Sequence, residues 1–410
     1  MTVALIEAGG SDLYHWVHIP VGYVYTMRYP QHRTNWGFAT SSQEGLGGRE
    51  IFYPRGKVLG GSGSINGMSF KSRLSQKSAR TCRLEDRIAM RGQPEDYDAW
   101  AAMVGDEGWS WEQLRPHFER LVNYTAGPPV LPDGTALGTG GPLEVTKQVT
   151  SWAILDEWAL ACERFGLQKR SHFIDSSKEG VGYFEVTQTH ARSGRGGVRL
   201  SPYRAFVAPI RDRRPNLTIF TNLHARKVSL EREADSLRAT GVELWLRAPR
   251  DGWFDYLRAV LVDLGLITGR PDKVAQKQRD VPCSIRARRE VVLACGAISS
   301  PHLLQCSGIG DPKLLKKASV EPIVDLPGVG KNLQDHLQIR AVFRLHESVD
   351  TLNSRMASWW GIVRTGLEYI LWQTGPMAMA PSQLGVFAKY SAALETPDLQ
   401  WHARLAPRQK

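Results

Sequence analysis

The sequence is short of cysteine and has neither a long apolar run nor an apolar leader. None of its five cysteines forms a Cys-x-x-Cys pair, which argues against a zinc site or a disulfide framework and favours reduced thiols. Its longest uncharged run, residues 369–388, contains two prolines and several polar side chains, so it does not suit a membrane-spanning helix. The first residues lack the basic start and apolar centre of a signal peptide. We therefore expect a cytoplasmic protein with no metal site and no transmembrane segment, for which peripheral attachment to a membrane stays open.

Acidic residues are fewer than basic ones, which gives a formal net charge of +11. A surplus of this size is typical of nucleic-acid-binding proteins. Here the basic residues are scattered except in residues 69–87, so we expect no nucleic-acid partner. The length of 410 residues, with 42% hydrophobic and 23% charged residues, is typical of a soluble globular chain with room for two domains.

Glycine is concentrated in one place, the stretch YPRGKVLGGSGSING at residues 53–67. Glycines let the backbone approach a flat or phosphorylated ligand closely, and the serines, asparagine, arginine and lysine add hydrogen-bonding groups and positive charge. A flexible linker is the alternative interpretation. The apolar residues Val58, Leu59 and Ile65 among the glycines favour an anchored ligand loop.

The first stretch, VALIE at residues 3–7, predicts a buried strand that ends in Glu7. An acid at the end of the second strand of a nucleotide-binding βαβ unit holds ribose hydroxyls, although a solvated strand end is an equal alternative. The G-x-G-x-x-G turn that should precede such an acid by about 20 residues is absent, because the chain begins on the acid's own strand.

Residues 284–310 form a second informative block. They predict a strand over EVVLAC (290–295), a glycine turn, and a helix capped by Ser300 with Pro301 in its first position. Such a unit suits ligand binding because a helix N-terminus offers free N–H groups, but it is also a common structural joint. The pair Asp335–His336 could support acid–base chemistry, yet adjacent residues rarely point at one reacting atom, so we favour a structural role.

The remaining chain alternates between regular and irregular stretches. We predict helices after Gln93, after a cap at Ser110 and over residues 150–165, and strands over residues 181–189, 217–231 and 239–246. Residues 190–199 are rich in glycine and arginine, and we favour a solvated connection over a loop that covers a ligand. Two segments fit no pattern: residues 69–87 are strongly basic, and residues 249–282 are too long for a hairpin loop. We treat both as probable insertions.

Together these stretches resemble the glucose–methanol–choline (GMC) family of FAD-dependent alcohol oxidoreductases, in particular its choline-dehydrogenase-like members. YPRGKVLGGSGSINGM resembles the family's first signature, and GAISSPHLLQCSGIG resembles its second. Supporting stretches are IEAGG, RGQPEDYDAW, GWSWEQLRPHFER, RPNLTIFTNLHARKV, PGVGKNLQDHL and MAPSQLGVFAK. Two long signatures in the correct order are highly specific, and the resemblance covers most of the chain outside the two insertions.

The resemblance implies an α/β fold combined with an α+β part. One domain is a Rossmann-like FAD/NAD(P)-binding domain, here incomplete because its first strand is missing, and the other is a substrate domain built on an antiparallel sheet. By position, residues 1–68 and 196–330 correspond to the FAD-binding domain. Residues 88–195 and 331–410 correspond to an incomplete substrate-binding domain.

The resemblance also implies which residues hold FAD. Glu7 matches the acid on the FAD ribose, and Ala225 matches the residue whose backbone meets adenine. Along the pyrophosphate and the isoalloxazine, the expected contacts are Arg55, Val58, Gly60, Gly61, Ser62, Ser64, Asn66 and Gly67. Some family members bind flavin covalently through a histidine in the first signature. This chain has Ile65 at that position, so we expect FAD to be held non-covalently.

Family chemistry removes a proton from an alcohol oxygen and passes a hydride from its carbon to flavin N5, which gives an aldehyde or a ketone. The histidine that assists belongs to a segment beyond the SQLGVF motif, and none of the eleven histidines here matches it, so we expect no catalytic residue in this chain. We expect an enzyme acting on a small alcohol such as choline, with the electron acceptor and the oligomeric state left open. The alternative is a truncated, non-catalytic remnant. In either case we expect this polypeptide alone to bind FAD poorly and to oxidise alcohols barely.

Overall fold

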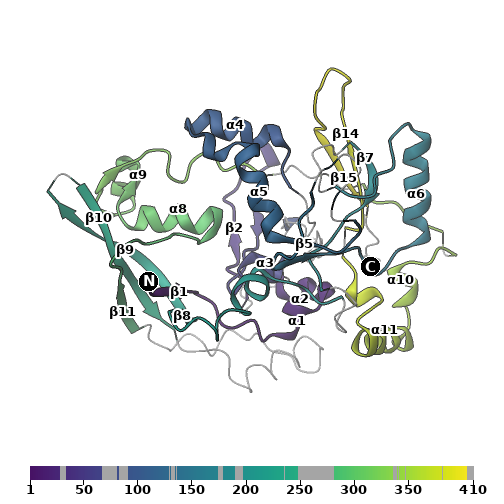
Figure 1. Ribbon diagram of the computed structural model, residues 1–410, viewed down its shortest axis with the longest axis horizontal. Coiled ribbons are helices and arrows are strands. Elements are labelled where there is room, and N and C mark those ends of the chain that lie inside the picture. The colour runs from purple at the N-terminus through teal and green to yellow at the C-terminus, as the bar shows by residue number, and fades with distance from the viewer. Residues whose placement is uncertain are drawn as a thin grey trace. The chain divides into compact units, whose positions relative to one another are not determined.

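The computed structural model describes most of the chain (Figure 1). The described residues are 1–27, 34–66, 81–82, 91–128, 130, 134, 136–173, 179–189, 197–234, 236–247, 281–335, 339, 341–346, 348–380 and 382–403. Contacts divide the chain into two compact units. Unit 1 comprises Met1–Ser11 and Asn216–Arg344, and unit 2 comprises Asp12–Pro215 and Leu345–Lys410.

The described part of unit 1 includes three small sheets, and the third pairs the two short strands that follow residue 308. Strand β1 (Val3–Ile6) pairs in parallel with β8 (Leu217–Phe220). Strands β9 (Leu223–Glu233), β10 (Ser236–Leu246) and β11 (Val281–Arg286) form an antiparallel sheet in the order β11-β10-β9. The predicted strand at the start of the chain is therefore confirmed, as is the pairing of β9 with β10. The first strand is not buried as predicted, because Val3 is 39% exposed.

Two strand predictions in unit 1 are corrected. Residues 217–220 do not continue into β9, because Asn222 has a positive φ of 59° and turns the chain between the two strands. Residues 290–295 form no strand and have no strand partner among the described residues, and Val292 is 76% exposed. The end of the expected insertion at 249–282 also belongs to β11, and residues 248–280 lie outside the described part.

The helical part of unit 1 follows residue 295. Helix α8 (Gly296–Cys306) packs on β9, where the Val228 N–H donates to Ser307 Oγ at 2.8 Å. Beyond it lie β12 (Ile309–Gly310), α9 (Pro312–Lys317) and β13 (Val324–Asp325). The predicted cap is wrong. The helix begins at Gly296, and Ser300 Oγ instead accepts from the Cys295 N–H at 3.1 Å, which closes the turn before it.

Unit 2 begins with short elements around the glycine-rich stretch. These are α1 (His15–His18), α2 (Tyr23–Met27) and α3 (Ser62–Ile65). The three-stranded sheet beside them comprises β2 (Phe38–Ala39), β3 (Ile51–Tyr53) and β4 (Thr81–Cys82), with β3 in the middle. The two residues of β4 fall inside the expected insertion at 69–87, whose other residues lie outside the described part.

The larger part of unit 2 is built around an antiparallel sheet (Figure 1). Its strands, β7 (Gly180–Tyr183), β14 (Leu384–Ala388) and β15 (Leu399–Ala403), are ordered β15-β14-β7. Helix α6 (Ala153–Arg164) packs on it, and Trp152, Leu155, Val181, Leu384 and Val386 belong to its buried core. The predicted helix over 150–165 is confirmed. The predicted strand over 181–189 is too long, because regular pairing ends at Tyr183.

The remaining elements of unit 2 are α4 (Pro94–Val104), α5 (Trp111–Leu121), β5 (Val122–Tyr124), β6 (Leu143–Val145), α10 (Leu352–Arg355) and α11 (Trp359–Trp372). Ser110 occupies the predicted cap position of α5 without a side-chain hydrogen bond, and Asp98 Oδ1 accepts the Trp111 N–H instead, at 2.9 Å. Among the described helices, none is both long enough and apolar enough to cross a bilayer.

The contact division differs from the domains expected from sequence. Residues 12–66 belong to unit 2, whereas the sequence placed them in one domain with residues 196–330. A contact division reports which residues pack together and not which ligand they bind. The assignment of 1–68 and 196–330 to FAD, and of 88–195 and 331–410 to substrate, therefore stays a prediction.

Candidate functional site

The glycine-rich stretch is a tight bend that closes on its own hydrogen bonds. The Gly56 N–H donates to Ser62 Oγ at 3.1 Å, and the Ser64 hydroxyl donates to the Leu59 carbonyl at 2.7 Å. The Asn66 N–H donates to the Ser62 carbonyl at 2.6 Å, within the single turn of α3. These contacts span residues 56–66, so the bend has a defined backbone conformation.

Apolar side chains fix the bend to unit 2. Val58 and Ile65 are each 1% exposed and pack with Tyr23 and Met27 of α2. Burying two such side chains stabilises the bend by about 1.5–3 kcal/mol for each. This anchoring is what a flexible linker would lack.

The glycines of the bend serve different purposes. A Cβ on Gly56 would lie 2.2 Å from the Gly61 carbonyl carbon, and a Cβ on Gly63 would lie 2.3 Å from Pro202 Cδ. Gly60 and Gly61 have φ values of +90° and +56°, which L-residues with side chains rarely adopt. At Gly61, however, a Cβ would meet nothing within 4 Å. The backbone at Gly61 is therefore open to an approaching ligand, whereas the space beside Gly56 and Gly63 is filled by the protein.

The segment that follows β3 carries two cations. Asn35 Oδ1 accepts the Arg55 N–H at 3.1 Å and holds the start of the bend. The Arg55 guanidinium lies 4.2 Å from the centre of the Tyr53 ring, and Lys57 Nζ lies 4.7 Å from a ring centre of Trp36. Cation–π contact orients both charges.

Arg199 is a residue of this region that the sequence interpretation missed. It is 2% exposed, and its guanidinium donates to the carbonyl and to Oδ1 of Asn66 and, at 3.0 Å, to the Pro20 carbonyl. Among the described residues it has no carboxylate partner, and its Nε has no hydrogen-bond acceptor. Burial lowers the pKa of Arg199 to about 9, although Tyr369 and Tyr23 oppose the shift.

Arg199 therefore remains charged at neutral pH, in a place where an unpaired charge is costly. The expectation that residues 190–199 form a solvated connection is wrong for Arg199, and residues 190–196 lie outside the described part. No local pattern distinguishes a buried arginine from a solvated one. The hydrogen bond from Arg199 to Asn66, at a sequence separation of 133, shows that Arg199 positions the end of the bend.

A second charged cluster joins Arg204 to Asp12 and to His18 of α1. Asp12 is 4% exposed and accepts from Arg204 Nε at 2.5 Å, and Arg204 Nη2 lies 3.3 Å from His18 Nε2. Because a guanidinium can only donate, His18 Nε2 is the acceptor and its lone pair is occupied. Burial, and then the charge of Arg204, lower the pKa of His18. His18 is thus neutral near pH 7 and is not a free general base in this arrangement.

In unit 1, the expected adenosine contacts lie at the end of β1 and in β9, and the Leu223 N–H of β9 donates to the Glu7 carbonyl at 3.0 Å. Glu7 follows β1, and its Oε1 accepts the Gly9 N–H at 2.7 Å. Ala225 lies in β9 opposite Leu244, directly before a bulge at Arg226 that interrupts the register with β10. Bulges locally break the ladder and are frequent next to binding sites.

The structure thus places the predicted cofactor residues in two groups. The bend of unit 2 brings together Arg55, Val58, Gly60, Gly61, Ser62, Ser64 and Asn66, whereas Glu7 and Ala225 belong to unit 1. Gly67 and His336 lie outside the described residues. Val58 contributes its side chain to the core and Ser64 its hydroxyl to the bend, so any ligand contact they make leaves these interactions in place. The cofactor role of all these residues stays a prediction.

Comparison with known families identifies the chain. A family model described as GMC oxidoreductase matches residues 86–259 and 273–338, which is more than half of the sequence. The chain belongs to the GMC oxidoreductase family. The match does not cover residues 260–272, which lie within the expected insertion at 249–282.

Curated relatives of this GMC chain include proteins named oxygen-dependent choline dehydrogenase. It is 30% identical over 401 residues to an oxygen-dependent choline dehydrogenase of Brucella anthropi, a match that covers 98% of this chain and 60% of the relative. It is 30% identical over 404 residues to the enzyme of the same name from Photobacterium profundum, with 98% of this chain and 58% of the relative covered. The chain therefore spans about 60% of the length of these relatives.

Solved structures show the same fold. Pyridoxine 4-oxidase from Mesorbium loti superposes with a TM-score of 0.68 at 22% identity, over 99% of this chain and 62% of that chain. A formate oxidase superposes with a TM-score of 0.69 at 21% identity, over 94% of this chain and 57% of that chain. The predicted fold class is confirmed: a Rossmann-like α/β part combined with a substrate part built on an antiparallel sheet.

Proposed function

We propose that residues 53–66 form part of an FAD site in an enzyme that oxidises a small alcohol, of the choline type, to an aldehyde or a ketone. Membership of the GMC oxidoreductase family is the observation that carries this proposal. The relatives named oxygen-dependent choline dehydrogenase support an alcohol that resembles choline. Bound FAD would supply the hydride acceptor.

The residues of the bend suit a flavin nucleotide. Gly61 leaves its backbone open, Arg55 and Lys57 carry positive charge suited to a pyrophosphate, and Asn66 presents an amide whose position Arg199 fixes. Glu7 and Ala225 are proposed as adenosine contacts on the resemblance alone.

The flavin would be bound non-covalently. A covalent link needs a nucleophilic side chain beside the isoalloxazine, and the corresponding position here is Ile65. Its side chain is 1% exposed and packs into the core of unit 2, so it supplies neither a nucleophile nor a ligand contact.

Titration of the purified chain with FAD, followed by flavin fluorescence, tests the cofactor. Weak but saturable binding that riboflavin does not match is expected, because the cationic residues of the bend recognise the pyrophosphate. Absence of saturation would support a non-catalytic remnant instead.

Anaerobic mixing of the FAD-loaded chain with choline tests the reaction. Slow bleaching of the oxidised flavin band is expected with choline, and less with ethanol, which lacks the quaternary ammonium group. Equal bleaching by both alcohols would contradict the choline-type substrate, and no bleaching by either would contradict the activity while leaving the cofactor site intact.

A further inference from the structure

Helix α11 has its polar and apolar faces reversed relative to an ordinary surface helix. Thr365 and Tyr369 are its buried residues, and the Tyr369 hydroxyl donates to the Gly197 carbonyl at 3.3 Å. The opposite face is apolar and exposed: Trp359 is 62% exposed, Trp360 67%, Leu367 50%, Ile370 75% and Leu371 62%. Amphipathic surface helices normally turn such residues towards the core. This face of α11 therefore has the composition of a contact surface.

The spacing on this face matches that of a helix-pairing seam. Trp360, Val363, Leu367 and Ile370 are separated by three, four and three residues, which are the a and d positions of two consecutive heptads. A seam of this kind buries its side chains against a second helix. Packing against a lipid surface or an irregular loop does not require this a/d spacing.

The exposed area is close to what a dimer needs. With about 150–250 Å² for each aromatic side chain and somewhat less for each aliphatic one, the exposed fractions correspond to roughly 600–700 Å² of apolar surface. The largest apolar patch of a monomeric protein is about 300–600 Å², and a stable interface buries about 800 Å² on each partner.

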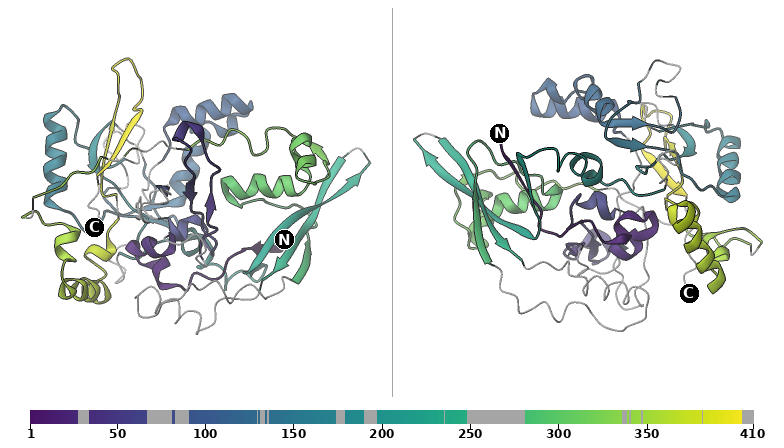
Figure 2. Two further views of the ribbon diagram at one scale, coloured as in Figure 1. Left: turned by 180° about the vertical axis from the view of Figure 1, so that it is seen from behind. Right: turned by 60° about the horizontal axis from the view of Figure 1, so that its bottom comes forward.

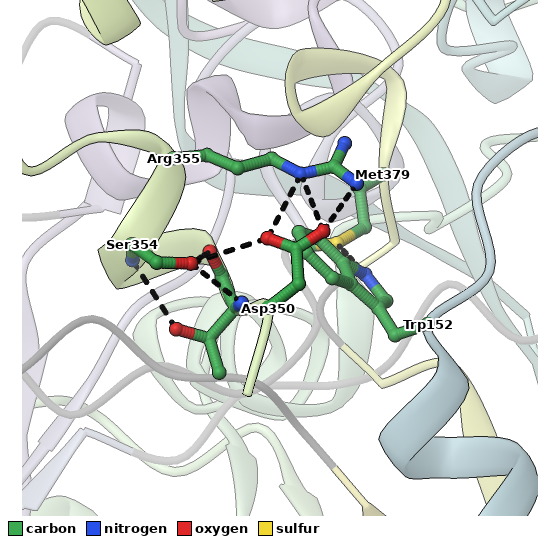
Figure 3. Close-up of polar contacts among 6 residues, drawn as sticks. Trp152, Asp350, Ser354, Arg355 and Met379 are labelled. Atoms are coloured by element: carbon green, nitrogen blue, oxygen red, sulfur yellow. Dashed lines mark hydrogen bonds and ion pairs between the residues drawn. The ribbon is translucent and has the colours of Figure 1, made fainter. Parts of the chain in front are cut away.

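The segment before α11 is held by a network of polar contacts (Figure 3). In α10 and the two residues before it, Asp350 Oδ2 accepts from Arg355 Nη2 at 2.7 Å, and the Ser354 hydroxyl donates to Asp350 Oδ1 at 3.1 Å. The Arg355 guanidinium lies 4.5 Å from the Trp152 ring, whose Nε1 donates to Met379 Sδ at 3.2 Å. This network ties the segment before α11 to the core of unit 2, so little ordering is needed when a partner docks.

Charge distinguishes the possible occupants. The only charged residues of α11 are Arg364 and Glu368, so the helix carries no net charge. Two copies of it do not repel each other. A helix that lies on an anionic bilayer typically carries a basic face, which α11 lacks because its polar side packs on unit 2.

We propose that α11 is a self-association surface, on which a second copy of this chain docks its own α11 in antiparallel orientation (Figure 2 shows the helix from two sides). Antiparallel pairing of the seam sets Trp360 against Ile370 of the second copy, and Val363 against Leu367 of the second copy. The contact is isologous, because both copies use the same surface and each pair of residues occurs twice. This inference is independent of the flavin chemistry.

Sedimentation equilibrium of the full chain over a range of concentrations tests the proposal. The wild type is expected to form dimers, and Leu367→Lys/Ile370→Lys is expected to weaken dimerisation by at least about tenfold, because four lysine side chains would then enter the seam opposite Val363 and Trp360 of the other copy. The control is Met103→Lys/Val104→Lys in α4, where the side chains are 81% and 60% exposed, and its dimerisation is expected to equal that of the wild type. The single variant Ile370→Glu repeats the test if the double variant is unfolded by circular dichroism.

Three outcomes would overturn the proposal. The wild type could remain monomeric at every concentration, or both α11 variants could dimerise as well as the wild type. Alternatively, monomeric wild type could float with phosphatidylcholine–phosphatidylglycerol vesicles and lose this property in the α11 variants, which would assign the face to lipid.

Discussion

Glu185 provides a test of the interior of unit 2 that needs no ligand. It is 1% exposed and has two long hydrogen bonds, from the Tyr124 hydroxyl at 3.3 Å and from the Phe173 N–H at 3.4 Å. Burial raises the pKa of Glu185 from 4.5 to about 7, because these two donors compensate only part of the lost hydration.

The shift determines how stability depends on pH. Between about pH 4.5 and 7 the folded chain holds a proton on Glu185 that the unfolded chain has released, so the free energy of unfolding falls as the pH rises. At 1.36 kcal/mol per pKa unit, the loss is about 3 kcal/mol, and it is complete above about pH 7. In Glu185→Gln the side chain stays neutral, its oxygen can accept from Phe173, and its amide can donate to Tyr124.

Urea unfolding of the wild type and Glu185→Gln at about pH 4.5, 6 and 8 measures this effect. The two proteins are expected to have similar stability at the lowest pH, and the variant is expected to be more stable by about 3 kcal/mol at the highest. The matched control is Glu157→Gln on the exposed face of α6, which should change stability by less than about 0.5 kcal/mol at every pH. A stability difference between the wild type and Glu185→Gln that does not change with pH would refute the reasoning.

Three further predictions concern the residues around the glycine-rich bend. Arg199→Met should lower the free energy of unfolding by about 2–4 kcal/mol, because the buried acceptors on Asn66 and Pro20 lose their donor. Arg199→Lys should recover part of this loss. Equal stability of the wild type and Arg199→Met in urea would count against the prediction. Gly63→Ala should lower the free energy of unfolding by about 1–3 kcal/mol, because its Cβ would lie 2.3 Å from Pro202. Gly366→Ala is the control: its Cβ would lie in open space within a helix, so it should raise the free energy of unfolding by up to about 1 kcal/mol. Thermal melts of the two variants compare these effects. Because the pKa of His18 is lowered in the folded chain, its contribution to stability should be present above about pH 6.5 and decline below it; urea midpoints of His18→Asn that decline with acidity as steeply as those of the wild type would contradict this.

Regular elements with strong local patterns were predictable. The strand before Glu7, the helix over 150–165 and the pair β9–β10 follow from hydrophobic periodicity, and the two signatures identified the family before any coordinates. The anchoring of the bend was predictable, since Val58, Leu59 and Ile65 are buried as an anchored loop requires.

Features that depend on a distant partner were not predictable. Residues 290–295 have the composition of a strand, but a strand also needs a hydrogen-bonded neighbour, and none lies beside them among the described residues. Arg199 and Asp12 resemble solvated charges until their partners are known, and Arg204 is separated from Asp12 by 192 residues. The reversed polarity of α11 likewise requires knowledge of which face the fold covers.

The central claim is that the bend at residues 53–66 lies against a flavin nucleotide, and FAD titration of Gly61→Val tests it most directly. A valine side chain would fill the open space beside that backbone, so FAD binding should weaken by about tenfold or more. Gly105→Val is the matched control, because Gly105 also has a positive φ and open space but ends α4. Binding that is saturable in the wild type, retained in Gly105→Val and lost in Gly61→Val is the predicted result. Equal affinity of the Gly61→Val variant and the wild type would contradict the claim.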